Sequence, residues 1–445
     1  MIKILNFKNK HFLALFGNFV IAVFSLLNMS LLYRSMSKSE IGTWFLFLSI
    51  QSVIESFRAG FLGTATIKFY AGAKNDRKET VLGSIWFIAV SISIIFIVAN
   101  GIFWLFTKNI EYPQMLIIVK WVGLTFLSSL PFTVTIWILM ADEDYENILK
   151  IRLVNNVSMF LIISVLVWLQ KMNIENLMLL NFATNLLTSF FCFLIKKSHF
   201  QTIFKFAKSI IIEVAEFGKF NLGGYFANII FKNADTFIIS LFLGPSYLAI
   251  YSLPSKLMAI IELPLGSFLG TGMSAMAIAM NRNRKDELLE IFKKYVGLLT
   301  IAFIPLIIGC MIFADLAISI LGGAKYIGSE AANIFRIMVF FTLLFPFDRF
   351  SGITLDMLHL PHLNFKKILI MSFFSIGGTF VGVLIFKNLY GIAIISPLTV
   401  ISGVLFGYYS LRKNLDFTIK DILQIGLKEF KLKLDHVLKI GKSFF

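Results

Sequence analysis

Several charged side chains stand inside long apolar stretches of this sequence, where burying a charge is expensive. They share a position away from the ends of those stretches: Glu55, Arg58, Lys120, Lys232, Asp235, Lys256, Glu262, Asp315, Arg336, Asp348 and Arg349. A charge at the centre of a bilayer costs about 3 kcal/mol on the insertion scale. If all of these side chains faced lipid, the summed cost would exceed the roughly 5–15 kcal/mol of net stability typical of a protein. Most of them must therefore face an interior.

The chemistry that these residues could perform is the binding of an anion. The bases are suited to neutralise an anionic substrate, and the candidate contacts are Arg58, Lys232, Lys256 and Arg349. The acids are suited to orient those bases or to couple to an ion, and the candidates are Glu55, Asp235, Glu262 and Asp348. Lys256 has no carboxylate three or four residues away on its own helix, so it needs a partner on another helix or a ligand.

Ion pairing between helices is the competing interpretation of the same residues. Glu55 and Arg58 are three residues apart, so they can meet on one helical face. The same spacing relates Lys232 to Asp235. Such pairs can hold a structure together without touching a ligand. Asp348 and its neighbour Arg349 point in different directions on a helix, which argues against a simple mutual pair.

Residues suited to catalysis or to metal binding are scarce. His359 and His362 stand three apart, but a proline intervenes and a third ligand is lacking nearby. The sequence contains no P-loop, HExxH or GxSxG pattern. We interpret one acidic cluster as a solvated turn: Asp142, Glu143, Asp144 and Glu146. We therefore predict a protein that is not an enzyme, with no catalytic residues, no metal and no cofactor.

The composition predicts an all-α, polytopic membrane protein. Of its 445 residues, 58 % are hydrophobic and only 15 % are charged, and the mean hydropathy is +0.82. Such values lie far from those of a soluble domain. At roughly 20 residues per crossing, we expect about twelve transmembrane helices, over residues 11–33, 41–63, 81–106, 115–140, 151–169, 175–195, 220–243, 247–272, 295–321, 331–357, 366–386 and 389–411.

The distribution of positive charge predicts the orientation. The net charge is +16, and most lysines and arginines fall in the segments on the same side as both termini. The positive-inside rule then places both termini in the cytoplasm and explains the charge without a nucleic-acid partner. Both cysteines, Cys192 and Cys310, lie in apolar runs, so a disulfide framework is not expected.

An internal repeat organises the chain. Shifting the numbering by 207 places Glu262 on Glu55 and the sequence FLGT at 268–271 on FLGT at 61–64. We interpret this as duplication into two parallel-repeat bundles. The expected segments are an N-terminal six-helix bundle at 1–195, a cytoplasmic amphipathic linker at 196–219, a C-terminal six-helix bundle at 220–411 and a basic amphipathic cytoplasmic tail at 412–445. We expect the tail to lie on the surface of anionic lipid.

Three segments resemble one transporter family. The run from Asp235 to Tyr251, the turn SEIGTW at 39–44 and the run from Ala314 to Tyr326 are similar to segments of the polysaccharide transporter family. This family belongs to the multidrug/oligosaccharidyl-lipid/polysaccharide exporter superfamily, and the similarity is greatest to O-antigen flippases. Ala249 replaces a glycine that is common in the family. The resemblance implies two six-helix bundles around a central cationic cavity that opens alternately to either side.

The resemblance also implies the function. We expect a flippase that moves undecaprenyl-diphosphate-linked oligosaccharide, for O-antigen, lipopolysaccharide or another polysaccharide, from the cytoplasmic to the periplasmic leaflet of the bacterial inner membrane. Expected partners are this substrate, membrane lipids and other polysaccharide-assembly proteins, and a proton or sodium gradient is a candidate energy source. The alternatives are a multidrug or organic-cation antiporter, a glycan polymerase or ligase, and a scaffold. Short outer loops argue against the membrane enzyme.

Overall fold

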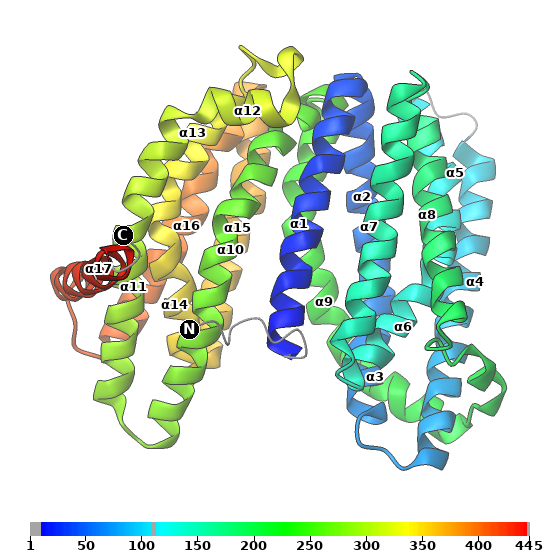
Figure 1. Cartoon of the computed structure of the whole chain (residues 1–445), viewed down its shortest axis with the longest axis horizontal. Coiled ribbons are helices and arrows are strands. Elements are labelled where there is room, and N and C mark those ends of the chain that lie inside the picture. Colours follow the sequence, from blue (N-terminus) through cyan, green and yellow to red (C-terminus); the bar gives the residue numbers. More distant parts are fainter. Residues whose placement is uncertain (1–9, 108–112, 443–445) are drawn as a thin grey trace. The chain divides into compact units, whose positions relative to one another are not determined.

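A computed structural model describes residues 10–107 and 113–442, and these residues form helices and turns without any strand (Figure 1). The all-α prediction is confirmed. The chain divides into two compact units, Met1–Phe237 and Ile238–Phe445. The expected cytoplasmic ends at 1–9 and 443–445 lie outside the described residues.

Unit 1 consists of the helices that precede the division. They are α1 (Lys10–Ser35), α2 (Lys38–Arg58), the π-helical turn η1 (Ala59–Gly63), α3 (Thr64–Tyr70), α4 (Asn75–Thr107), α5 (Pro113–Ser128), α6 (Leu130–Ala141), α7 (Tyr145–Trp168), α8 (Ile174–Leu194), the 3₁₀ turn η2 (Phe200–Lys205) and most of α9 (Lys208–Phe242). α1 packs against α7, and α5 packs against both α4 and α8.

Unit 2 begins near the end of α9 and includes a long hairpin of two helices. Its elements are α10 (Pro245–Asn281), α11 (Lys285–Ile312), α12 (Ala314–Gly322), the 3₁₀ turn η3 (Ala324–Tyr326), α13 (Ala331–Phe341), the 3₁₀ turn η4 (Thr342–Leu344), α14 (Phe345–Met357), α15 (Pro361–Phe386), α16 (Leu389–Arg412) and α17 (Ile419–Lys442). α15 packs against α16, and α14 packs against both α15 and α16.

The helices match the expected membrane spans. In the described part of the chain, nine helices are long and apolar enough to cross a bilayer, and α5 and α6, which meet at a bend of 42°, make a tenth if they are counted as one span. α1 and α9 cover the two remaining expected spans, at 11–33 and 220–243. Pro131, in the first turn of α6, cannot donate a backbone hydrogen bond, which is consistent with a break at this point.

The helix boundaries follow the internal repeat. α1 ends at Ser35 and α9 ends at Phe242, a shift of 207. α2 begins at Lys38 and α10 begins at Pro245, which is the same shift. Because helix ends depend on local residues that differ between the two copies, their agreement supports the duplication independently of the FLGT match.

A second shift relates the later helices of the two units. Asn173 caps α8 and Asn388 caps α16, 215 residues later, and each side chain accepts a hydrogen bond from the backbone N–H three residues on. Asparagine is a favoured N-cap because its side chain satisfies an orphan donor of the first turn. Pro131 and Pro346, near the starts of α6 and α14, differ by the same 215. The repeat therefore extends as far as α8 in the first copy and α16 in the second.

The segment expected to link the halves, 196–219, packs within unit 1. The indole of Trp86 is fully buried and donates a hydrogen bond of 2.9 Å to the Ser198 carbonyl. A Cβ added at Gly83 would lie 2.4 Å from the Thr202 carbonyl oxygen, so α4 and η2 are in close backbone contact. The helix α9 then runs without a break from Lys208. The division between units falls inside this helix, at 237/238, rather than at residue 220.

The tail forms a helix that rests on α11 (Figure 1). On α17, Ile422 and Gly426 are buried against α11, whereas Lys420 and Lys428 are exposed. Glu429 forms an ion pair of 2.9 Å with Lys294 of α11. The helical, amphipathic part of the expectation agrees with this geometry, and its attraction to anionic lipid stays a prediction.

Candidate functional site: two clusters of charge

The first cluster is built at the end of α2. Arg58 is completely buried, and its Nη2 lies 2.6 and 2.7 Å from the two carboxylate oxygens of Glu55. The same guanidinium donates to the Phe126 carbonyl at 3.1 Å and to the Ser129 hydroxyl at 2.8 Å. Its Cζ also lies 4.3 Å from the centroid of the Phe126 ring. Glu55 and Arg58 therefore meet as their spacing predicts.

The bend between α5 and α6 supplies the remaining partners of this cluster. Ser129 lies at the bend and its hydroxyl donates to Glu55. Arg58 is fully buried and Glu55 is only 22 % exposed, so removing either partner would leave the other charge poorly compensated. The geometry therefore favours a structural role for Arg58, and contact of Arg58 with an anion stays a prediction.

The second cluster lies where α14, α15 and α16 meet. Lys367 Nζ is 2.9 Å from Asp348 Oδ1, and both side chains are only 4 % exposed. The ammonium donates to the Asp348 backbone carbonyl and, at 3.2 Å, to the Ser351 hydroxyl. A Cβ on Gly403 would lie 2.7 Å from the Asp348 carboxylate, and one on Gly407 would lie 2.6 Å from the Ser351 hydroxyl. Glycine at these positions allows α16 to pack directly on the ion pair.

Arg349 extends this cluster towards α10. Its Nη2 is 3.8 Å from Glu262 Oε2, and its Nε is 4.0 Å from Asp348 Oδ2. The side chain of Arg349 is 48 % exposed and that of Glu262 is 39 % exposed. Asp348 and Arg349 thus differ sharply in burial, as expected for neighbours on a helix, and Lys367 is the nearer partner of Asp348.

The other candidate residues lie on α9 and α10. Lys232 is exposed and Asp235 is half-buried on α9, whereas Lys256 is half-buried on α10. Their roles in binding or coupling stay predictions. Two bases outside the four candidate anion contacts have acidic partners: Lys120 lies 3.4 Å from Glu175, and Arg336 pairs with Asp315.

Lys367 was not among the candidates predicted from the sequence. The expected span at 366–386 begins beside it, so Lys367 and Lys366 both resemble flanking charges, but Lys367 is buried in the second turn of α15 and only Lys366 is exposed. A signal was present in the repeat, because the shift of 215 places Lys367 on Arg152, a half-buried base of α7. Two bases at equivalent positions of two copies indicate more than a flanking charge.

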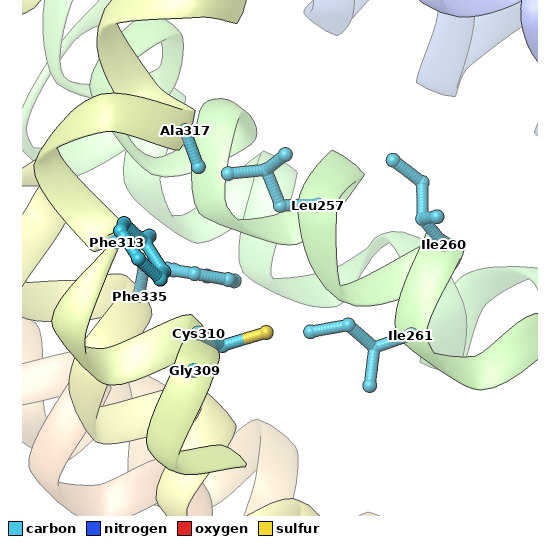
Figure 2. A pocket seen from close by; sticks show the side chains of 8 residues that line it. All are labelled: Leu257, Ile260, Ile261, Gly309, Cys310, Phe313, Ala317 and Phe335. Carbon is cyan, nitrogen blue, oxygen red and sulfur yellow. The ribbon is translucent and has the colours of Figure 1, made fainter. Parts of the chain in front are cut away.

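An apolar pocket of about 280 Å³ lies between α10, α11, α12 and α13 (Figure 2). Figure 2 shows its walls, which are lined by Leu257, Ile260, Ile261, Gly309, Cys310, Phe313, Ala317 and Phe335. No lining residue is charged, so this pocket is suited to hydrocarbon rather than to an anion. It is distinct from the contact between Arg349 and Glu262, although Ile261 and Glu262 are neighbours on α10.

The family model of the polysaccharide biosynthesis proteins matches residues 31–331, which is well over half of the chain. The chain belongs to this family. The matched range includes the complete Glu55–Arg58 cluster and reaches the start of α13. No curated protein matches the chain in sequence.

Several solved structures of transporters share the fold of this chain. The inward-facing form of a multidrug resistance MATE family transporter of the MOP superfamily superposes with a TM-score of 0.72 at 13 % identity, over 89 % of this chain and 96 % of the other. The lipid II flippase MurJ, in an inward closed conformation, gives 0.67 at 16 % identity, over 95 % and 92 %. A MOP superfamily transporter from Pyrococcus furiosus gives 0.58 at 12 % identity, over 89 % and 93 %.

This polysaccharide biosynthesis protein has the polytopic fold of the MOP transporters, so the expected fold class and family are confirmed. In the described residues, no group of three or more histidine, cysteine, aspartate or glutamate side chains is placed to hold a metal.

Proposed function

We propose that this protein is a flippase for undecaprenyl-diphosphate-linked oligosaccharide, the repeat unit of O-antigen or of another polysaccharide. It carries this lipid from the cytoplasmic to the periplasmic leaflet of the bacterial inner membrane by alternating access, with both of its termini in the cytoplasm. Membership of a polysaccharide biosynthesis family supports this proposal. So does the fold shared with a lipid II flippase, since both functions move a large lipid-linked group.

The observation that carries the proposal is the exposure of the Arg349 side chain deep within its span. This residue is more than two helical turns from Met357, the nearer end of its span. Its side chain is nevertheless 48 % exposed and lies 3.8 Å from its carboxylate partner. A charge at this depth is unfavourable in hydrocarbon, so such exposure is expected only beside a polar passage. A guanidinium is well suited to bind the phosphate oxygens of a diphosphate in a bidentate manner.

A reconstituted transport assay tests this proposal. Proteoliposomes would carry a lipid-linked oligosaccharide with a labelled sugar, and translocation would be followed by its accessibility to a sugar-modifying enzyme outside. We expect Arg349→Gln to slow translocation about tenfold or more, because one charge-assisted contact is worth about 1.5–3 kcal/mol. Arg336→Gln is the matched control, since Arg336 is bound to Asp315 and should leave the rate nearly unchanged. Equal rates for Arg349→Gln and the unmodified protein would refute the role of Arg349.

The superposition on a multidrug resistance transporter favours one alternative, an antiporter of organic cations. A cationic ligand would be repelled by Arg349, so Arg349→Gln would preserve or increase its export. Efflux of a fluorescent organic cation from the same proteoliposomes separates the two functions. Efflux without oligosaccharide movement would replace the flippase by the antiporter.

A further inference from the structure

Four charged side chains form a chain of alternating sign across unit 2. Glu262 of α10 lies 3.8 Å from Arg349 of α14, Arg349 lies 4.0 Å from Asp348, and Asp348 lies 2.9 Å from Lys367 of α15. Exposure decreases along this chain, from 39 % and 48 % at Glu262 and Arg349 to 4 % at each of the other two side chains. This series of four charges therefore has a fixed, buried end and an accessible end.

Unit 1 shows what a permanent ion pair looks like in this protein. Glu55, which the shift of 207 aligns with Glu262, lies 2.6 Å from an arginine with no exposed side-chain surface. That arginine also donates to Phe126 and Ser129. At Glu262 the corresponding distance is 3.8 Å, and both partners are substantially exposed. Exposed pairs with long contacts contribute little, about 0–1 kcal/mol, so they exchange partners readily.

The buried end of this series of charges, Asp348 with Lys367, explains why Asp348 does not hold its neighbour Arg349. Asp348 is next to Arg349 in sequence, but its carboxylate is turned to the ammonium of Lys367. Among the described residues, its Oδ1 accepts no well-directed hydrogen bond. Without Lys367, this buried carboxylate would have Arg349 as its remaining cationic partner within 4.0 Å. The attraction would be strong because it would act in a poorly solvated interior.

We propose that Glu262 is an internal carboxylate that occupies Arg349 until a phosphate or diphosphate group replaces it, and that Lys367 is a positioning residue that keeps Asp348 from taking the same place. This inference rests on the proposed function, because it assumes an anionic lipid headgroup as the substrate. A carboxylate and a phosphate bind a guanidinium with the same fork geometry. A diphosphate carries more charge than a carboxylate and is therefore the stronger ligand of Arg349.

Binding to the purified full-length protein tests the exchange. The probes are farnesyl diphosphate, which supplies a lipid-linked headgroup, and inorganic pyrophosphate, which supplies the headgroup alone, both measured by titration calorimetry in detergent. We expect Glu262→Gln to tighten binding roughly threefold to tenfold, because the competing carboxylate is lost. Glu55→Gln, the matched change in unit 1, should lower the melting temperature without tightening binding. Unchanged or weaker binding by a folded Glu262→Gln variant would overturn the proposal.

The role of Lys367 is tested by rescue. Lys367→Met removes no group that contacts the headgroup, yet we expect it to weaken farnesyl diphosphate binding about tenfold because Asp348 then engages Arg349. Combining it with Asp348→Asn should restore binding, since the competing carboxylate is neutralised. A purely structural role predicts that the loss and the recovery of binding both follow the melting temperature, whereas the positioning role predicts weak binding by Lys367→Met at temperatures where this variant is fully folded. A double variant that is folded but still weak would overturn the role of Lys367.

Binding and transport results separate this inference from the proposed function. Tighter binding by Glu262→Gln without oligosaccharide translocation by the unmodified protein would support the exchange and refute the flippase. Translocation that depends on Arg349, with no tightening in Glu262→Gln, would support the flippase and refute the exchange. If the two probes bind equally tightly, the headgroup alone is recognised. If farnesyl diphosphate binds more tightly, the lipid chain contributes. If neither probe binds, the inference is overturned.

Discussion

Gly297 of α11 and Gly426 of α17 touch backbone to backbone, since a Cβ on Gly426 would lie 2.3 Å from the carbonyl carbon of Gly297. A Cβ on Gly297 would lie 2.1 Å from the Ile422 carbonyl oxygen. Neither helix can accept a side chain at this crossing unless the other moves, because the obstacles are backbone atoms. The position of α17 on α11 therefore depends on two glycines that are 129 residues apart in sequence.

Substitution at this crossing should loosen α17. We expect Gly426→Val to displace α17 from α11. Overpacking at the crossing costs typically 1–3 kcal/mol, and displacement of this helix relieves the clash. Hydrogen exchange over residues 419–432 should become faster, while the other helices of unit 2 keep their protection. Gly270→Val is a suitable control because nothing lies within 4 Å of its Cβ. Equal protection of α17 in both variants would contradict the prediction.

The Glu55–Arg58 pair should be much more important for stability than for binding. Breaking one side of a buried pair typically costs 3–5 kcal/mol, so Arg58→Met should lower the melting temperature strongly. The double variant with Glu55→Gln should recover part of the loss, because no unpaired charge is then left. Thermal unfolding in detergent measures both effects. Glu175→Gln, at an exposed pair, provides a control with an expected change of about 0–1 kcal/mol.

Asp144 gives a prediction for pH dependence outside the spans. Partial burial tends to raise its pKa, but hydrogen bonds from Asn147 and Lys197 outweigh this effect and hold the pKa below its ordinary value. A lowered pKa in the folded state stabilises the protein above the unfolded value of about 3.9, and this stabilisation is lost as pH falls through the folded value. Asp144→Ala should therefore destabilise by about 1 kcal/mol at pH 7, as expected for loss of an N-cap.

The same substitution should matter less in acid. The difference in melting temperature between the Asp144→Ala variant and the unmodified protein, recorded from pH 7 down to pH 3, should decrease once the pH falls below about 3.9. A difference that stays constant over this range would show that the side chain acts by packing alone. Asp416→Ala is a control, because among the described residues this exposed side chain makes one long contact, to Arg412 at 3.6 Å.

The two cysteines should react differently with a small alkylating reagent. Cys192 is fully buried, whereas Cys310 is half-buried at the wall of the apolar pocket in Figure 2. We expect N-ethylmaleimide to modify Cys310 in the native protein and Cys192 only after unfolding. Intact-mass measurement on Cys310→Ala and Cys192→Ala variants assigns the modification. Native modification of the Cys310→Ala variant would contradict the geometry.

Much of the fold could be predicted from the sequence, because long apolar runs follow from the bilayer itself. The approximate positions of the helices and the pairing of Glu55 with Arg58 agree with the structure. The packing of residues 196–219 within unit 1 was not foreseen, since amphipathic patterning does not distinguish a lipid surface from a protein surface. Nor was Lys367, because a base near the end of an apolar run is usually a flanking charge and its partner is 19 residues away.

The two shifts of the repeat differ, so the two copies differ in length over one part of the chain. A shift of 207 holds to Thr271 and a shift of 215 holds from Pro346, so the later copy is eight residues longer than the earlier one between these points. The short helix α12 lies in this interval, and Ala317 of α12 forms part of the wall in Figure 2. The wall of this crevice therefore includes a helix from the interval in which the two copies differ in length, and neither shift assigns that helix a counterpart in the other copy.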